Sequence, residues 1–317
     1  MPKKIDLLVG GFPCQPFSKS GKQMGMEETR GTLFWNIAKI IEARKPSLVL
    51  LENVQNIVGP RHFHEWEVII KTLRDLGYRV SEDPMVVSPH LIKPEFGGRP
   101  QVRNRVFIAA TLIPKGIPNF KGNVEIPNLE PVMQGWDPLS WNLEKDLPLD
   151  KIKSANEKKN VSLTESEIRW IEAWNEFVLI MRDRLKGEKL PGFPIWADAW
   201  VHIDELKIPK GTPDWKKTFL QKNSQFYTDH KVVLNKWLKK WDNLEDFPPS
   251  RRKFEWQAQD ASSIWECVIQ FRPSGIRVKK STYLPALVAI TQTSVIGSRR
   301  RRITPREAAR MQGFSDS

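Results

Sequence analysis

The sequence predicts an α/β fold, a parallel sheet with helices on both faces, into which a long irregular segment is inserted. Over residues 1–113, apolar runs typical of buried strands alternate with helix-like periodicity, which is the pattern of a parallel sheet. The alternation disappears over residues 114–283, which contain scattered prolines and lysines and eleven of the chain's thirteen tryptophans. We therefore expect 114–283 to be a separate module, after which residues 284–317 return to the core.

The composition favours a globular protein with a polyanionic partner. Of the 317 residues, 40% are hydrophobic, and 50 basic against 37 acidic residues give a net charge of +13. This excess favours nucleic acid as the partner, with an anionic membrane surface second. The two cysteines, Cys14 and Cys267, are too few for a disulfide framework or a structural zinc site. Because we find neither a membrane-spanning apolar run nor a signal peptide, we expect a soluble cytoplasmic protein.

The core is expected to begin with two buried strands that flank a helix. Residues 5–10 form an apolar run closed by glycine, and residues 47–51 form a second one. Between them, apolar residues recur at helical spacing from Leu33 to Ile41, in a helix that should end before Pro46. Since parallel sheets bind ligands at the carboxyl ends of their strands, the residues after these two strands are candidates for chemistry.

The core then continues with one more helix and further strands. Apolar residues at helical spacing predict a helix at 66–73, which Gly77 would end. Two further apolar runs, 78–87 and 106–112, predict strands.

The inserted module and the tail each carry one clear helix signal. In the module, a helix is expected at about 163–185, where Ser162 and Glu165 have the spacing of a capping box. In the tail, Thr304 followed by Pro305 marks the start of a last helix.

Three polar features could carry chemistry. Cys14 follows the first strand, where partial exposure and nearby amide donors would favour a reactive thiolate, although many cysteines are simply buried and inert. Glu52, directly after the second strand, is suited to share a proton, unless it only caps a helix or lies on the surface. Arg103 and Arg105 would point the same way on an extended segment and could grip a phosphate or a base carbonyl, unless they lie on a solvated edge.

Together and in this order, these features resemble the motifs of the DNA cytosine-5 methyltransferase family. The chain contains Pro13-Cys14-Gln15, then Glu52-Asn53-Val54, then Gln101-Val102-Arg103-Asn104-Arg105. Further matches are Arg30-Gly31-Thr32-Leu33-Phe34 and the tail Arg301–Phe314. The resemblance covers about 1–113 and 284–317, and 114–283 would be the variable target-recognition region of a bacterial restriction-modification enzyme. It implies a partial Rossmann-like S-adenosylmethionine-methyltransferase sheet.

The resemblance also implies a covalent mechanism on a flipped-out base. Since C5 of cytosine is inert, Cys14 would first add to C6 while Glu52 protonates or hydrogen-bonds N3 and the exocyclic amine. C5 would then take the methyl group from S-adenosylmethionine, and loss of the C5 proton would expel Cys14. Because a stacked base is inaccessible, the target in double-stranded DNA must be flipped out, and residues 15–28 would close over it as a lid.

Binding roles follow from the same resemblance. Arg105, aided by Arg103, would hold the base carbonyl and a nearby phosphate. Other contacts with DNA, or support of the lid, are assigned to Gln15, Ser18, Arg30 and Gln101, and minor cofactor contacts to Pro13 and Leu33. From the basic run itself we expect Arg299 and Arg300 to contact phosphates, unless the run is a solvated turn.

The match is incomplete at both ends. The family's aromatic-x-Gly-x-Gly cofactor loop is missing, since no Gly-x-Gly occurs anywhere in the chain, and so is the Asn-containing segment after the late helix. We therefore expect either one subunit of a split enzyme, completed by a partner polypeptide that carries the cofactor motifs, or a truncated reading frame. Two other functions stay open: a non-catalytic, sequence-specific DNA-binding remnant and, ranked lower, a tRNA cytosine-5 methyltransferase.

Overall fold

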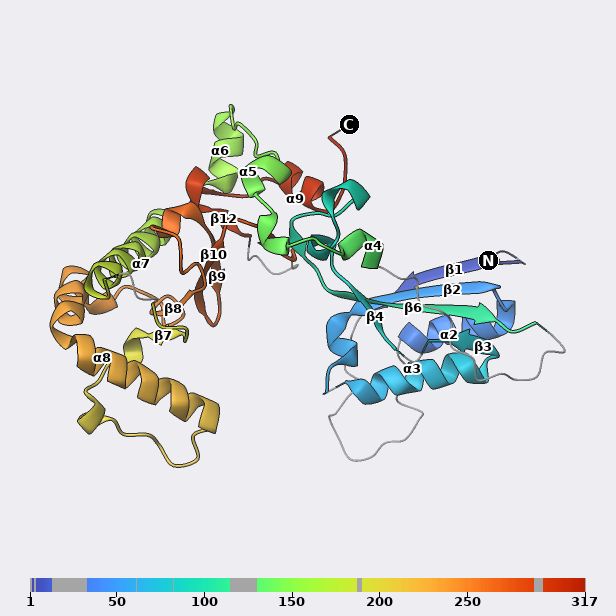
Figure 1. Cartoon of the computed structure of the whole chain (residues 1–317), viewed down its shortest axis with the longest axis horizontal. Coiled ribbons are helices and arrows are strands. Elements are labelled where there is room, and N and C mark those ends of the chain that lie inside the picture. The colour runs from blue at the N-terminus through green and yellow to red at the C-terminus, as the bar shows by residue number, and fades with distance from the viewer. Residues whose placement is uncertain are drawn as a thin grey trace. The chain divides into compact units, whose positions relative to one another are not determined.

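The computed structural model describes residues 2, 4–12, 33–60, 62–81, 83–114, 130–186, 190–287 and 293–316. The chain divides into two compact units. The first unit comprises residues 1–98 and 102–137, and the second comprises 99–101 and 138–317 (Figure 1).

A mixed five-stranded sheet forms the centre of the first unit. The strands are β1 (Leu7–Gly11), β2 (Leu48–Val54), β3 (Tyr78–Val80), β4 (Met85–Val87) and β6 (Arg105–Leu112). Their order is β1-β2-β6-β3, and β4 also pairs with β6. β1 pairs with β2 in parallel, and β6 is antiparallel to β2, β3 and β4, so that β6 alone runs against the direction of the other four strands. The sheet is thus not the parallel one that the sequence predicted, because the chain reaches β6 without the crossover helix that a parallel neighbour needs.

Helices cover one face of this sheet in the part of the chain that the structure describes. The helices are α2 (Leu33–Arg44), α3 (Phe63–Asp75) and the short α4 (Glu130–Met133), of which α2 and α3 pack on the sheet (Figure 1). Their core partners are the buried side chains of β2 and β6, including Leu51 and Ile108. On the opposite face, Leu7, Val9 and Leu48 are 52%, 64% and 49% exposed. The α/β class is confirmed, but the prediction of helices on both faces holds for one face only.

The second unit contains a six-stranded sheet and most of the helices. In the order β13-β12-β9-β10-β8-β7, the strands are Arg301–Arg302, Val295–Ile296, Cys267–Arg272, Gly275–Lys280, Lys253–Trp256 and Ile195–Trp196. The helices are α5 (Leu143–Asp146), α6 (Ala155–Val161), α7 (Glu165–Arg184), α8 (Asp214–Lys240) and α9 (Pro305–Met311). Two further short strands are β5 (Gln101–Val102) and β11 (Leu284–Pro285).

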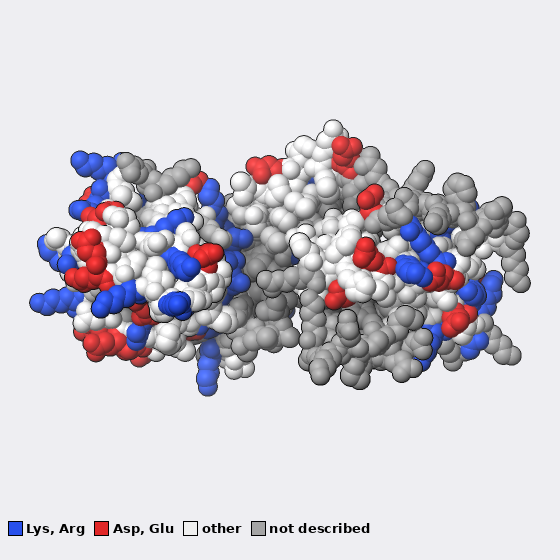
Figure 2. Space-filling view, turned by 90° about the horizontal axis from the view of Figure 1, so that it is seen from below, with Lys and Arg blue, Asp and Glu red and all other residues white. Residues whose placement is uncertain are grey.

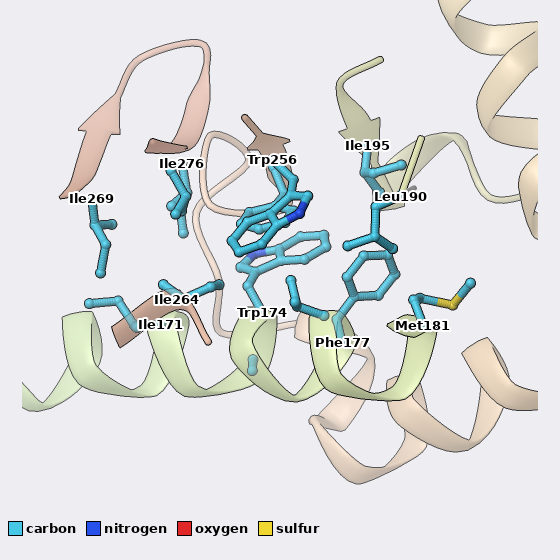
Figure 3. Close-up of a cluster of buried hydrophobic side chains, with 14 of the residues drawn as sticks. Ile171, Trp174, Phe177, Met181, Leu190, Ile195, Trp256, Ile264, Ile269 and Ile276 are labelled. Atoms are coloured by element: carbon cyan, nitrogen blue, oxygen red, sulfur yellow. The ribbon is translucent and has the colours of Figure 1, made fainter. Parts of the chain in front are cut away.

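One face of the second sheet packs on α7 through a core rich in aromatic rings. Trp174 stacks on Phe254 with ring centroids 4.9 Å apart and meets Trp237 at 5.3 Å. Figure 3 shows Trp174 and Phe177 rising from α7, Trp174 toward Trp256 on the sheet and Phe177 toward Leu190. Many of the tryptophans of this segment are therefore core residues.

Several boundaries differ from those predicted. The capping box of α7 is formed by Thr164 and Glu167 instead of Ser162 and Glu165, because Ser162 ends the preceding helix α6. The sequence analysis did not identify α8, which is 27 residues long. The predicted start of the last helix is confirmed, since Thr304 caps α9.

The tail packs within the second unit, although the sequence predicted that residues 284–317 return to the core formed by 1–113. Strands β12 and β13 join the second sheet, and Ile303 and Met311 pack in a cluster with Leu143 and Leu147. The first boundary also differs, since the units divide after residue 137 instead of 113. Among the described helices, none has the length and apolar character needed to cross a membrane.

Candidate active site

The carboxyl ends of β1 and β2 lie next to each other, as the order of the sequence motifs requires. In the parallel pairing of the two strands, Gly11 is the partner of Glu52. Cys14, three residues after Gly11, lies outside the described residues, as do Pro13, Gln15, Ser18 and Arg30. The structure therefore shows Glu52 at the strand end that leads into the cysteine loop.

Glu52 and Arg105 form an ion pair on the sheet face that α2 and α3 leave uncovered. The antiparallel register of β2 and β6 sets Arg105 opposite Val54, so that Arg105 and Glu52 share a face two positions apart. Arg105 Nε lies 2.7 Å from Glu52 Oε1, and the two side chains are 19% and 35% exposed. The contact engages one carboxylate oxygen of Glu52, Oε1, and no described residue bonds to the other, Oε2.

Gly11 provides the space that the second oxygen needs. A Cβ atom at position 11 would lie 3.2 Å from Glu52 Oε2, closer than most real Cβ contacts. Any larger residue at Gly11 would press on the carboxylate. The two sequence motifs thus constrain each other through direct contact.

Asn53 connects the two strand ends. It is 1% exposed, its Nδ2 donates to the carbonyl of Phe12 at 3.1 Å, and its Oδ1 accepts from the amide of Val54 at 2.8 Å. Phe12 is the last described residue before the cysteine loop. Asn53 therefore fixes the point where the loop leaves the sheet, a role that the Glu52-Asn53-Val54 motif alone did not predict.

The loop before β6 positions Arg103 and Arg105. The amide of Arg103 donates to Ser88 Oγ at 2.9 Å, and Asn104 Nδ2 donates to Gln55 Oε1 at 2.6 Å. Burial lowers the pKa of Arg105, the charge of Arg103 lowers it further, and Glu52 opposes both effects. Positive charge is thus concentrated beside a single carboxylate.

A cavity of about 340 Å³ opens at this cluster. Its lining includes Glu52, Arg103, Arg105 and Phe107. The volume lies in the range of about 300–1,000 Å³ that is usual for small-ligand pockets. The cavity thus combines a carboxylate, two guanidinium groups and one aromatic ring.

Gln101 was predicted to touch DNA or to steady the lid, and its burial argues against direct contact. It is 1% exposed and its Nε2 has no hydrogen-bond partner. The neighbouring Pro100 carbonyl accepts from the amide of Leu284 at 2.8 Å, so the segment is held within the second unit. A supporting role for Gln101 stays a prediction.

Arg299 and Arg300 each have a partner within the second unit. Arg299 Nη2 lies 2.5 Å from Glu144 Oε2, and Arg300 lies 3.7 Å from Glu172 and 4.4 Å from the ring centre of Trp265. Their contact with phosphates stays a prediction, since both side chains remain about half exposed.

Cys267 can be excluded as the nucleophile. It is fully buried, and burial, followed by the charge of Glu266, raises the pKa of its thiol to about 12. The chain has only two cysteines, which leaves Cys14 as the candidate.

The predicted cofactor contacts, Pro13 and Leu33, lie only partly within the described residues. Of the two predicted cofactor contacts only Leu33 is described, and it is 54% exposed at the start of α2. Leu33 lines neither the cavity at Glu52 nor a second one of about 500 Å³ beside Thr304.

Comparisons with known proteins identify the family. The family model described as C-5 cytosine-specific DNA methylase matches residues 1–317. The Type II methyltransferase M.AluI of Cellulosimicrobium cellulans is 42% identical over 386 aligned positions, which span 98% of this chain and 73% of M.AluI. M.HaeII of Haemophilus aegyptius is 35% identical over 65% of this chain and 69% of its own length.

Other similarities are more partial. M.HhaI of Haemophilus parahaemolyticus is 37% identical over 37% of this chain and 33% of its own length. The solved structure of S. pombe Dnmt2 methyltransferase is 21% identical, with a TM-score of 0.31 over 51% of this chain and 42% of that one. Neither a non-catalytic remnant nor a tRNA methyltransferase is favoured over a DNA methyltransferase by these matches. The chain belongs to the C-5 cytosine-specific DNA methylases, which use S-adenosylmethionine to methylate cytosine in DNA.

Proposed function

We propose that this chain supplies the nucleophile and the target-recognition part of a DNA cytosine-5 methyltransferase of a bacterial or phage restriction-modification system. The observation that carries the proposal is the Glu52–Arg105 pair, which lies beside Gly11 at the strand end leading to Cys14. We further propose that the enzyme acts in the cytoplasm, where its DNA substrate is found.

In the proposed reaction, the thiolate of Cys14 forms a bond to C6 of a flipped-out cytosine. The electrons of the C5–C6 double bond shift toward C4 and those of C4–N3 to N3, which takes a proton from Glu52 when Oε2 is protonated; when ionised, Glu52 accepts a hydrogen bond from the exocyclic amine. After C5 has been methylated, a base removes the C5 proton, the C5–C6 double bond re-forms, and the C6–S bond breaks to release the Cys14 thiolate. Arg105 keeps the carboxylate in place through Oε1, and Arg105 and Arg103 can donate to the base carbonyl and a phosphate. S-adenosylmethionine supplies the methyl group.

Residues of the second unit would choose the DNA sequence, and positive charge on this unit supports that role. Figure 2 shows lysine and arginine side chains over the part of the molecule that holds α7 and α8, at the left of the view. Such charge attracts phosphates without distinguishing sequences. Exchanging residues 138–283 for the corresponding segment of a relative with another specificity should move the methylated sequence with the segment.

We also propose a complementary polypeptide that carries the missing cofactor motifs. Two observations on the first unit support it. The face with Leu7, Val9 and Leu48 exposes apolar side chains, and β1 has β2 as its only neighbour among the described strands. A second polypeptide could extend the sheet at β1 and cover this face.

The nucleophile is tested by trapping on DNA. With duplex DNA that carries 5-fluorocytosine, the C5 substituent cannot leave, so the wild-type enzyme, reconstituted with the partner polypeptide, should form a stable covalent adduct. Cys14→Ser should abolish both adduct and methyl transfer while DNA binding persists, whereas Cys267→Ser should keep the adduct. An adduct that survives in Cys14→Ser would exclude Cys14 as the nucleophile.

The split-enzyme proposal is tested by calorimetry. The chain alone should bind S-adenosylmethionine weakly or not at all, because it lacks the glycines that let the backbone approach a cofactor. Adding the product of an adjacent reading frame should restore binding. Micromolar affinity of the chain alone would refute the need for a partner.

A further inference from the structure

We infer that the open face of the second unit's sheet reads duplex DNA, with Arg277 contacting a base edge and Lys279 and Arg272 contacting phosphates. The inference rests on the proposed function, because it names the surface through which that enzyme would recognise its target. It assigns base recognition to particular side chains of β9 and β10.

Side-chain alternation separates this face from the core. On β9 and β10, Ile269 and Ile276 point into the aromatic cluster above α7 (Figure 3). On the opposite face, the strand register places Arg277 between Glu255 on β8 and Gln270 on β9. We call this face the cationic face and define it by Trp196, Lys253, Glu255, Gln270, Arg272, Arg277 and Lys279.

Arg277 is held in one orientation by Glu255. Its Nε lies 2.6 Å from Glu255 Oε2, and the two side chains are 29% and 15% exposed. Within the described residues, the Nη groups of Arg277 make no hydrogen bond and can donate to a ligand. Because its Nε is held by Glu255, the guanidinium group of Arg277 is preorganised to donate two parallel hydrogen bonds. This bidentate geometry matches the O6 and N7 acceptors of guanine in the major groove.

Positive charge on the cationic face exceeds negative charge. Lys253, Arg272, Arg277 and Lys279 accompany one carboxylate, Glu255. The pKa of Lys279 is lowered by burial and then by the charges of Arg277 and Arg272, so these three cations are close enough to repel each other. Arg272 Nη1 is buried without a hydrogen-bond partner. A bound polyanion would relieve the repulsion among these cations.

The shape of the cationic face suits a DNA groove. The exposed residues Pro273 and Ser274 form the tip of a β9–β10 hairpin. A two-stranded ribbon fits the major groove, which is about 12 Å wide. Here β8 pairs along β10 from Ile276, whereas β9 beyond Ile269 has β10 as its only partner among the described strands, so the hairpin tip and the β9 edge at Arg272 are the parts that can enter a groove. Gly275 allows β10 to approach β8 closely, because a Cβ atom at position 275 would lie 2.9 Å from the carbonyl oxygen of Lys253.

Flat aromatic rings support two of the lysines. Lys279 Nζ lies 5.2 Å from the ring centre of Tyr283, and Lys253 Nζ lies 5.0 Å from that of Trp196. Each ring limits the positions that the long side chain can take, so less entropy is lost when the ammonium group binds a phosphate.

The test uses the full chain and 30-base-pair duplexes with a randomised centre, selected by binding and then sequenced. The wild type should enrich one sequence. Arg277→Lys keeps the positive charge but cannot donate two parallel hydrogen bonds to one base. The preference for guanine at one position should therefore fall roughly tenfold or more, while the affinity for unrelated duplex is unchanged. Lys279→Ala should weaken both kinds of duplex alike, and flatten the slope of log affinity against log salt by about 0.9.

Two controls make the outcomes decisive. Lys71→Ala removes an exposed cation from α3 in the first unit and should change neither preference nor slope. Glu255→Gln should reduce base preference in the same direction as Arg277→Lys, with thermal unfolding showing that both variants fold. An unchanged enriched sequence in Arg277→Lys would overturn the assignment, whereas a wild type that binds no duplex would overturn the proposed function itself.

Discussion

Each unit has a sheet with one face covered by helices, and the open parts of the opposite faces differ in chemistry. In the second unit only part of that face is open, because Val268 and Ile296 at its β9–β12 end are buried in a cluster with Leu143. In the first unit the open face exposes Leu7 and Val9, whereas in the second it carries Arg272, Arg277 and Lys279. An apolar face is stabilised by contact with another protein surface, and a cationic one by a polyanion. The difference supports separate binding roles: a polypeptide on the apolar part of the first open face, which also carries the Glu52–Arg105 pair proposed to hold the target base, and duplex DNA on the second.

The largest effect on stability is expected at the covered face of the second sheet. Trp174→Ala should lower the free energy of unfolding of the second unit by about 3–5 kcal/mol, because it leaves a cavity among stacked rings. Thermal or urea unfolding followed by tryptophan fluorescence measures this change. Trp215→Ala is the matched control, since Trp215 is 61% exposed and its loss should cost about 0.5 kcal/mol or less. Equal effects of the two variants would contradict the aromatic core.

Much of the first unit could be predicted because its signals are local. The apolar patterns that predicted β1, α2, β2 and α3 each lie within a short stretch of sequence. The carboxyl ends of strands in α/β sheets are also known positions of ligand-binding sites. The meeting of Glu52 with Arg105 depends instead on an antiparallel register between β2 and β6, which no local pattern encodes. Sequence motifs therefore named the residues but not their contact.

The second unit was harder to predict, because its helices and tail depend on tertiary contacts. Helix α8 has lysines and asparagines among its aromatic residues, and the buried positions Asn223 and Ser224 interrupt its apolar stripe. Asn223 is stabilised by bonds to the carbonyls of Pro194 and Phe219, which only the folded chain provides. The pairing of the tail with β9 is a long-range contact, which no local pattern in the sequence encodes.

A second prediction tests the apolar open face. Val9→Lys places a charge in the middle of it and should weaken association with the cofactor-bearing polypeptide by about 2 kcal/mol or more, roughly 30-fold, with little effect on the chain alone. Sedimentation of the mixed polypeptides gives the affinity. Val232→Lys is the matched control, because Val232 is 73% exposed on α8 in the second unit. If both variants associate like the wild type, this face is not the contact surface.

A third prediction concerns the bond that joins the two strand ends at the site. Asn53→Ala should destabilise the chain by about 1–3 kcal/mol, because it leaves the Phe12 carbonyl and the Val54 amide without their side-chain partner. Trapping on 5-fluorocytosine DNA should also slow, since the cysteine loop would leave the sheet less rigidly. Asn56→Ala, at an exposed position nearby, should do neither. Normal trapping in a destabilised Asn53→Ala protein would limit Asn53 to a structural role.

The smallest effect is expected from Arg299 and Arg300, which are basic like the cationic face but lie beside carboxylates. Replacing both by alanine should weaken specific and unrelated duplex about equally and flatten the salt slope by no more than about 0.9, the value for one phosphate contact. The reason is that Glu144 and Glu172 already offset much of their charge.

Glu144→Gln sharpens this last comparison, because it releases Arg299 without removing it. If Arg299 reaches a phosphate, the variant should bind DNA more tightly and with a steeper salt slope than the wild type, the opposite of the double alanine variant. The counterpart on the cationic face is Lys279→Ala, whose cation has no carboxylate partner among the described residues. Unchanged slopes in both the Glu144→Gln and the double alanine variants would make the run an internally paired turn, and would leave phosphate binding to the cationic face.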